Sequence, residues 1–280
     1  MREINTKELA DAIRDMCIEA NLRLSEDMRQ KISEAESRET APIAKKILGQ
    51  LVENMTIAEK EQIPICQDTG MAVVFLEVGQ EVHFTGEFVE NAVNDGVRRG
   101  YQEGYLRKSV VSDPLERINT GDNTPAVLHT TIVPGQQVKI TVAPKGFGSE
   151  NMSRIVMLKP ADGVEGVKQT VLETVRLAGP NACPPMVVGV GIGGTFEKCA
   201  WLAKKALTRN QKEPSPLPGI RALEEELMTE INALGIGAGG LGGKTTALGV
   251  AIETYPTHIA GLPVAVNICC HVNRHVTRII

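Results

Sequence analysis

The spacing of apolar residues changes near residue 60, and this change constrains the fold more than any other feature of the chain. Between residues 4 and 60 the apolar positions Leu9, Ile13, Met16, Cys17 and Ala20 recur every three or four residues, which predicts helices, with Asn5 or Thr6 as the first cap. Beyond Cys66, short apolar runs separated by Gly and Pro predict strands that alternate with amphipathic helices.

The later runs have the length and composition of strands and helices of a mixed fold. Strands are expected at 71–79, 81–84, 125–133, 136–146, 185–194, 246–255 and 262–270, and helices at 86–109, 164–179, 195–209 and 220–235. The runs at 125–133 and 136–146 are expected to form a strand pair joined at Pro134-Gly135. We therefore predict one α+β domain over 1–280, with a helical N-terminal portion of about 1–60 and a mixed-sheet portion of about 61–280.

Composition excludes several classes of function. The chain has 280 residues, a net charge of −4 and 3% aromatic residues, without a basic stripe interleaved with aromatics, which argues against nucleic-acid binding. The N-terminus is charged and lacks an apolar signal region, and no apolar run approaches a membrane span. We expect a cytoplasmic protein without a membrane partner, whose six cysteines are thiols or metal ligands rather than disulfides.

Two glycine-rich stretches suggest a nucleotide-binding protein as an alternative. "AGGLGGKT" at 238–245 satisfies a relaxed phosphate-loop pattern, but a helical pattern precedes it and a strand pattern follows, the reverse of the order such a loop needs. "GVGIGG" at 189–194 follows a strand and precedes a helix, but lacks the acidic residue that ends a second strand in dinucleotide-binding units. Tight packing of a helix on a strand is the competing interpretation of the second stretch.

Cysteines occur in three polar, turn-like motifs: "CQDTG" with Cys66, "GPNACPP" with Cys183, and "NICCH" with Cys269 and Cys270. The distances between them in sequence exclude a short-spaced zinc site but allow convergence in space. Three thiolates that hold a four-iron cluster leave one iron open to a substrate. Cys17 on an apolar helix face and Cys199 inside a predicted helix favour packing roles.

Six motifs together resemble the α subunit of the two-subunit iron–sulfur hydro-lyases, the family of class I fumarate hydratase and L-tartrate dehydratase. They are "PICQDTG", "NTGDNTPAVLHT", "PKGFGSENMS", "GPNACPPMVVGVGIGGT", "GAGGLGGKTTALGV" and "THIAGLPVAVNICCH", which span most of the chain. The resemblance implies a [4Fe–4S] cluster whose ligands carry over to Cys66, Cys183 and Cys270. Relatives have Gln before the last ligand, so Cys269 is a departure from the family pattern.

The resemblance also implies roles for residues around the cluster. Gln67, Asp68 and His258 match active-site positions, and Arg107, Gly146 and Gly148 match substrate-binding positions, although the motif does not decide which of the two glycines contacts substrate. An Asx turn is the structural alternative for Asp68. His271 and His275 are four residues apart, the spacing of a metal-binding pair on a helix, but Arg274 between them and the nearby chain end favour exposed positions for both histidines.

The expected reaction is reversible hydration of fumarate to L-malate, with L-tartrate dehydration as the close alternative. In the family the catalytic base belongs to a β subunit, so this chain is expected to require a β partner. The resemblance further implies pairing of α chains in an α2β2 assembly, a small dicarboxylate substrate and sensitivity to oxygen.

Overall fold

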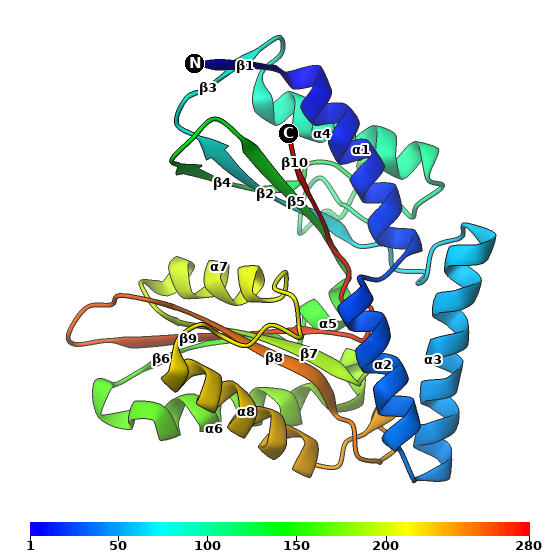
Figure 1. The fold of residues 1–280 in the computed structure, drawn as a ribbon, viewed down its shortest axis with the longest axis vertical. Helices are drawn as coiled ribbons and strands as arrows, with labels where there is room; N and C mark the ends of the chain where they lie inside the picture. Colours follow the sequence, from blue (N-terminus) through cyan, green and yellow to red (C-terminus); the bar gives the residue numbers. More distant parts are fainter. The chain divides into compact units, whose positions relative to one another are not determined.

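The computed structural model describes residues 1–280, and the internal contacts divide the chain into two compact units (Figure 1). Unit 1 comprises Met1–Ser25, Met55–Phe147 and Arg274–Ile280, and unit 2 comprises Glu26–Asn54 and Gly148–Asn273. Both units combine helices with a mixed sheet, so the predicted α+β class is confirmed. The organisation into a single domain stays a prediction. No helix has both the length and the apolar character that crossing a membrane requires.

Helices dominate the N-terminal region, as the sequence predicts. A short strand, β1 (Arg2–Asn5), is followed by α1 (Thr6–Leu22), α2 (Glu26–Arg38) and α3 (Pro42–Glu61). Asn5 is the cap of α1, because its Oδ1 accepts a hydrogen bond of 2.9 Å from the backbone N–H of Lys7. The five apolar residues predicted to share one face of this helix are all buried.

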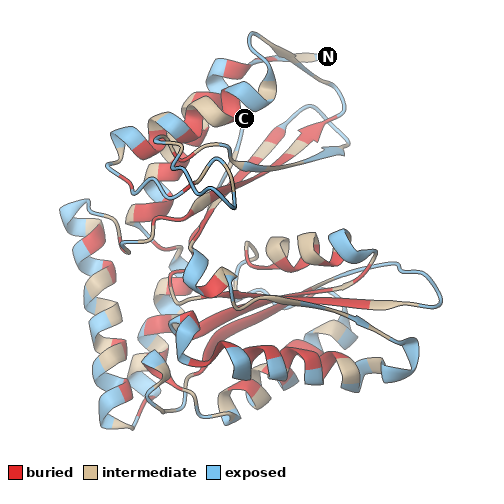
Figure 2. Ribbon diagram, turned by 180° about the vertical axis from the view of Figure 1, so that it is seen from behind, coloured by how far each residue is buried: buried red, intermediate tan, exposed pale blue.

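The sheet of unit 1 has four strands in the order β10-β5-β2-β4, and α1 and α4 pack against it (Figure 1). The elements are β2 (Met71–Gly79), α4 (Val89–Glu103), β4 (Val127–Val133), β5 (Val138–Lys145) and β10 (Val276–Ile279), while β3 (Val82–Thr85) pairs with β1 apart from this sheet. Alternate residues of β2 and β5 face the two helices and form the core of the unit, visible as buried residues in Figure 2.

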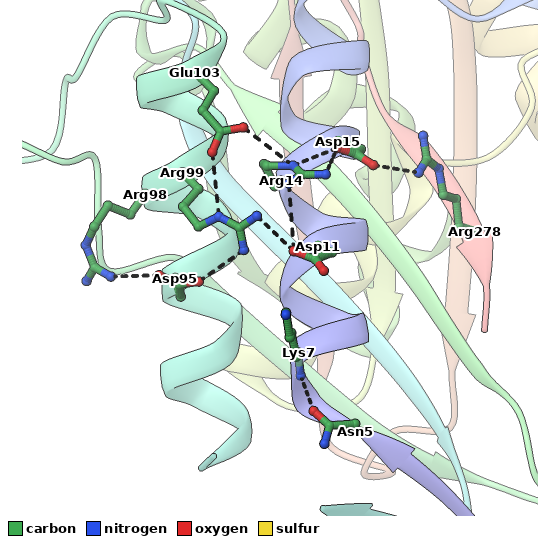
Figure 3. A network of polar contacts seen from close by, with 10 residues as sticks. All are labelled: Asn5, Lys7, Asp11, Arg14, Asp15, Asp95, Arg98, Arg99, Glu103 and Arg278. Carbon is green, nitrogen blue, oxygen red and sulfur yellow. Dashed lines mark hydrogen bonds and ion pairs between the residues drawn. The ribbon is translucent and has the colours of Figure 1, made fainter. Parts of the chain in front are cut away.

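Helices α1 and α4 approach each other closely because glycine lies at their contact. A Cβ atom at Gly96 would come within 2.6 Å of the carbonyl oxygen of Ala10. Ion pairs then bridge the exposed side of the helix pair, as Figure 3 shows. The shortest between the helices joins Arg99 to Asp11 at 2.8 Å, and its hydrogen bond raises the pKa of Arg99.

The strands β4 and β5 exist as predicted, but the prediction that they pair with each other is wrong, because β2 lies between them. Strand β2 is apolar and almost wholly buried, which suits an interior position, whereas β4 has no buried residue, which suits an edge. The connection between β4 and β5 crosses the end of β2, where Gly79 N donates to Gln137 O at 2.8 Å and Gln80 N donates to Val133 O at 2.7 Å.

The sheet of unit 2 has the order β6-β9-β7-β8, with α6 and α8 on one face and α7 on the other (Figure 1). The elements are α5 (Phe147–Glu150, across which the unit boundary falls), β6 (Arg154–Leu158), η1 (Pro160–Asp162), α6 (Gly163–Ala178), η2 (Gly179–Ala182), β7 (Met186–Gly193), α7 (Phe196–Ala206), α8 (Pro218–Ala233), η3 (Ala238–Gly240), β8 (Ala247–Tyr255) and β9 (Leu262–Cys269). Valine and isoleucine side chains of β7, β8 and β9 form the core with α6 and α8.

The glycines of "GVGIGG" allow α7 to lie directly on β7. A Cβ atom would come within 2.2 Å of Ala203 O if placed at Gly189, and within 2.0 Å of Cys199 O if placed at Gly191. Neither distance is compatible with a side chain, so these positions require glycine for packing. The stretch thus has a structural role of its own, without reference to a dinucleotide.

Candidate functional site

The Cys66 motif forms a loop of unit 1 between the end of α3 and the start of β2. Cys66 is half-buried and Gln67 is exposed. Asp68 uses both carboxylate oxygens: Oδ1 accepts a hydrogen bond from Gly70 N at 3.0 Å, and Oδ2 accepts one from Phe147 N at 2.9 Å. The first bond is an Asx turn, and the second fixes the loop to the segment that follows β5.

Buried side chains hold the carbonyl groups at the end of this loop. The hydroxyl of Tyr101 lies 2.8 Å from Thr69 O and 2.9 Å from Gly70 O, and Asn123 Nδ2 donates to Gly70 O at 3.1 Å. Burial raises the pKa of Tyr101, so its hydroxyl remains a protonated donor. The backbone of the Cys66 loop is therefore fixed by groups that are distant in sequence.

Two predicted substrate-binding residues lie beside Asp68 in unit 1. Thr69 Oγ1 donates to Arg107 O at 3.0 Å, which anchors the backbone of Arg107 while its side chain is exposed. A Cβ atom at Gly146 would lie 3.0 Å from Asp68 Oδ2, so the backbone at Gly146 runs close to this carboxylate. Unit 1 thus brings together Asp68, Arg107 and Gly146.

Cys183 and Cys270 lie at the same end of the unit 2 sheet. Strands β7 and β9 are antiparallel, with Val187 opposite Cys269, so the residues before β7 and those after β9 meet (Figure 1). Cys183 is exposed and has a left-handed φ of 51°, and His271 Nδ1 lies 3.0 Å from its carbonyl oxygen. Cys270 is half-buried directly after β9.

The stretch at 238–245 supports the Cys183 loop. Gly239 N donates to Pro184 O at 2.8 Å, and a Cβ atom at Gly240 would come within 2.4 Å of Pro180 Cβ. Helix α8 precedes this stretch and β8 follows it, so the strand-before, helix-after arrangement of a phosphate loop is absent. Its glycines instead give the backbone the close approach that the Cys183 loop needs.

Of two further predicted residues in unit 2, Gly148 lies near the Cys183 loop and His258 lies far from it. The atom nearest to a Cβ at Gly148 is Asn181 O, at 3.9 Å. His258 is exposed in the connection between β8 and β9, where Thr257 Oγ1 donates to Gly194 O at 2.9 Å. This connection is at the opposite end of the sheet from Cys183, so unit 2 does not bring His258 to its cysteines.

The six cysteines differ in exposure. Cys17, Cys199 and Cys269 are buried, Cys66 and Cys270 are half-buried, and Cys183 is exposed; none is in a disulfide. Burial raises the pKa of Cys17 to about 12 and also raises that of Cys199, which keeps both as neutral thiols. No group of three or more His, Cys, Asp or Glu side chains has a metal-binding arrangement.

Comparison with known proteins assigns the family. The family model described as fumarate hydratase (fumerase) matches residues 10–279. The chain belongs to the fumarate hydratase family. The enzymes of this family are hydro-lyases, and this chain belongs to the same enzyme class.

Relatives in the fumarate hydratase family match the chain over almost its whole length. The putative L(+)-tartrate dehydratase subunit alpha of Methanocaldococcus jannaschii is 43% identical over 274 residues, which cover 95% of each chain. The L(+)-tartrate dehydratase subunit alpha of Escherichia coli strain K12 is 31% identical over 277 residues, covering 98% of this chain and 91% of the relative. The protein of the same name from strain UTI89 is 32% identical over 274 residues, with coverages of 96% and 90%.

Sequence reasoning missed one buried residue beside the Cys66 loop. His271 and His275 were expected to be exposed, but both are half-buried, so that expectation is wrong, and Arg274 between them is only 4% exposed. Its guanidinium donates to Asp68 O through Nη2 and to Pro144 O through Nε at 3.3 Å, and these contacts bury it. Only a prediction of long-range contacts would have revealed this role, because a lone arginine near a chain end has no local signature. Asn123, by contrast, lies within the quoted motif "NTGDNTP".

Proposed function

We propose that this chain is the cluster-bearing α-type subunit of an enzyme that interconverts fumarate and L-malate by addition and removal of water. The observation that carries the proposal is the arrangement of Asp68, Arg107 and Gly146 around the loop that contains Cys66. A carboxylate, a guanidinium and a backbone amide beside a thiol suit a dicarboxylate bound next to a metal centre.

We propose Cys66, Cys183 and Cys270 as the ligands of a [4Fe–4S] cluster. Their chemistry fits, because these are the three cysteines with accessible side chains, whereas burial favours the neutral thiol at Cys17 and Cys199. Cys269 shares a face of β9 with Ala265, which packs against α7, so its side chain belongs to the core. When bound through three thiolates, the cluster supplies an open iron as a Lewis acid.

Residues of the Cys66 loop, Arg107 and one of the two glycines, Gly146 of unit 1 or Gly148 of unit 2, bind and orient the substrate in this proposal. The exposed guanidinium of Arg107 forms a bidentate contact with one substrate carboxylate, and the amide of Gly146 or Gly148 donates to an oxygen of the dicarboxylate. Gln67, which is exposed, donates its amide to the substrate hydroxyl. Asp68 orders this loop through its two backbone hydrogen bonds, and its remaining lone pairs accept from the hydroxyl or from water.

Dehydration also requires a base, which we assign to the β subunit. The base removes a proton from the carbon next to the hydroxyl-bearing carbon, and the hydroxyl leaves with the electron pair of its C–O bond, which yields the C=C bond. A β subunit is supported by the relatives, whose names designate them as alpha subunits.

His258 can serve the same site only from a second copy of this chain. The eight residues of β7 separate its connection from the end of the sheet that carries Cys183 and Cys270, a distance of roughly 25 Å. We therefore propose that α chains pair in an α2β2 assembly and that His258 of one copy contributes to the site of the other.

The substrate is a four-carbon 2-hydroxy dicarboxylate, and the family description favours the fumarate–malate pair. L-tartrate is the second candidate, because the relatives that match over the whole chain are named L(+)-tartrate dehydratase subunits. Tartrate differs from malate by one further hydroxyl, and nothing in Asp68, Arg107 or Gly146 selects against that group.

The deciding experiment is a steady-state assay of the anaerobically reconstituted αβ complex. We expect kcat/KM for L-malate to exceed that for L-tartrate, because the family description favours the fumarate–malate pair. The colour and iron content of the same sample provide the control, with brown protein and about four irons per chain. A preference for tartrate would replace the substrate assignment, and colourless, iron-free protein after anaerobic purification would refute the cluster.

A further inference from the structure

Arg274 is a buried cation within unit 1 that the proposed reaction has not yet used. The residue is 4% exposed and belongs to the C-terminal segment of unit 1. Its hydrogen-bond acceptors are two backbone carbonyl groups, those of Asp68 and Pro144. A buried charge is costly unless it is paired or fully hydrogen-bonded, so the surroundings of this guanidinium call for an explanation.

The two acceptors belong to the two segments that carry the proposed substrate contacts. Asp68 lies in the Cys66 loop, and Pro144 precedes Gly146 by two residues at the end of β5. Phe147 N donates to Asp68 Oδ2 at 2.9 Å and joins the same segments a second time. The rigid fork of a guanidinium can hold two carbonyls at a fixed separation, which a flexible ammonium cannot do.

One donor of Arg274 has no acceptor in the protein. Nη1 is buried and forms no hydrogen bond, while Nε and Nη2 are used. Buried donors without partners are rare in proteins, and the acceptor that suits a guanidinium best is an anionic oxygen. The Asp68 carboxylate is not this acceptor, because Arg274 binds the backbone carbonyl of Asp68.

We infer that Arg274 is a positioning residue for dicarboxylate binding. It holds the Cys66 loop against the end of β5, so that Asp68 and Gly146 keep their separation, and its positive charge, whose acceptors in the protein are both neutral carbonyls, favours an anionic ligand nearby. The inference rests on the proposed function for the identity of that ligand, whereas the clamp between the two segments rests on the hydrogen bonds alone.

The test compares Arg274→Gln and Arg274→Lys with the control Arg278→Gln in the reconstituted αβ complex. Arg278 is a matched control because it lies four residues later in the same segment and pairs instead with Glu19, at 2.6 Å. For Arg274→Gln we expect KM for the dicarboxylate to rise at least about tenfold at unchanged iron content, the effect of losing a charge-assisted contact. Arg274→Lys keeps the charge and should recover part of this loss, and Arg278→Gln should stay within about twofold of wild type.

Hydrogen exchange tests the clamp independently of the substrate. The amides of Gly70 and Phe147 both donate to Asp68, so Arg274→Gln should accelerate their exchange at least about tenfold while the amides of α1 and α4 keep wild-type rates. If Arg274→Gln fails to fold, Arg274→Lys should accelerate the exchange of the same two amides, because an ammonium cannot hold both carbonyls at a fixed separation. Unchanged exchange at both amides, or acceleration spread evenly over unit 1, would overturn the inference, as would a wild-type KM in Arg274→Gln. Inactivity of the wild-type complex towards malate and tartrate would refute the proposed function and leave the exchange result to decide the clamp.

Discussion

At the scale of single residues, burial separates the six cysteines into two groups. A metal-bound cysteine must lose its proton, and burial opposes this loss at Cys17, whose pKa is raised to about 12. Cys183 is at the other extreme, because it is exposed and has a left-handed backbone conformation that presents it at the start of β7. The chemical difference between the two groups of cysteines is therefore large enough to test one residue at a time.

Serine substitutions should divide the cysteines into two groups of three. Cys66→Ser, Cys183→Ser and Cys270→Ser should each abolish normal cluster assembly, because a serine hydroxyl does not replace a thiolate. Cys17→Ser, Cys199→Ser and Cys269→Ser are the matched controls and should retain about four irons per chain. The measurement is iron content after anaerobic reconstitution. Loss of iron in Cys269→Ser with retention in Cys270→Ser would show that the adjacent cysteines have been assigned in the wrong order.

The residues of the candidate site that match family positions could be predicted from the sequence. Asp68 and Gly146 lie in two of the quoted motifs, Arg107 matches a family position between them, and unit 1 places the three close together. Arg274 was not predictable, because its role depends on contacts with carbonyls more than a hundred positions away, and backbone acceptors leave no trace in sequence. The role of His258 stays a proposal, because its connection between β8 and β9 lies at the opposite end of the unit 2 sheet from Cys183.

At the scale of elements, one buried glutamate links the helical N-terminal region to the glycine-rich loop of unit 2. Glu39 is 2% exposed and lies just before α3. Its carboxylate accepts hydrogen bonds from Thr40 N at 2.8 Å, from Ala41 N at 2.9 Å and from Lys244 N at 2.7 Å. Burial alone would raise the pKa of Glu39, but these backbone donors outweigh it and hold the pKa below its usual value.

Glu39→Gln should destabilise unit 2 by about 1–3 kcal/mol, because the amide group presents a donor where backbone N–H groups need an acceptor. Since the folded-state pKa is lowered, the contribution of Glu39 is fully present above the unfolded value of 4.5 and disappears as pH falls through the lower folded value. The difference between wild type and variant in urea unfolding should therefore be large at pH 7 and shrink below about pH 4.5.

Glu26→Gln is the control for this prediction, because the Glu26 side chain is 81% exposed on α2. It should change the free energy of unfolding by less than about 0.5 kcal/mol. Equal stability of Glu39→Gln and wild type at pH 7 would contradict the role assigned to the Glu39 carboxylate.

Most elements were predictable because their apolar periods are strong, whereas strand pairing was not. The runs at 125–133 and 136–146 are close in sequence, and a hairpin is the expected result of a short turn between strands. Strand β2 displaced that pairing because it is apolar on both faces and can only be satisfied inside the sheet. The short strands β6 and β10 were missed, since four or five residues are too few to show a period.

At the scale of the whole molecule, the residues proposed for the site are distributed over both units of the chain. Unit 1 contains the Cys66 loop with Asp68, Arg107 and Gly146, and unit 2 contains the loops with Cys183 and Cys270. The assignment of the three thiols to one cluster comes from the family motifs. The proposed function assigns the catalytic base to a β subunit.

Turnover by the cluster-loaded chain with and without its β subunit tests this central claim most directly. We expect negligible hydratase activity from the chain alone, even with about four irons bound, and activity on addition of β together with a mass by light scattering that corresponds to α2β2. A complex of β with the Cys270→Ser chain is the control and should remain inactive. The same kcat for the cluster-loaded chain with and without β would contradict the account, because the base would then lie within these 280 residues.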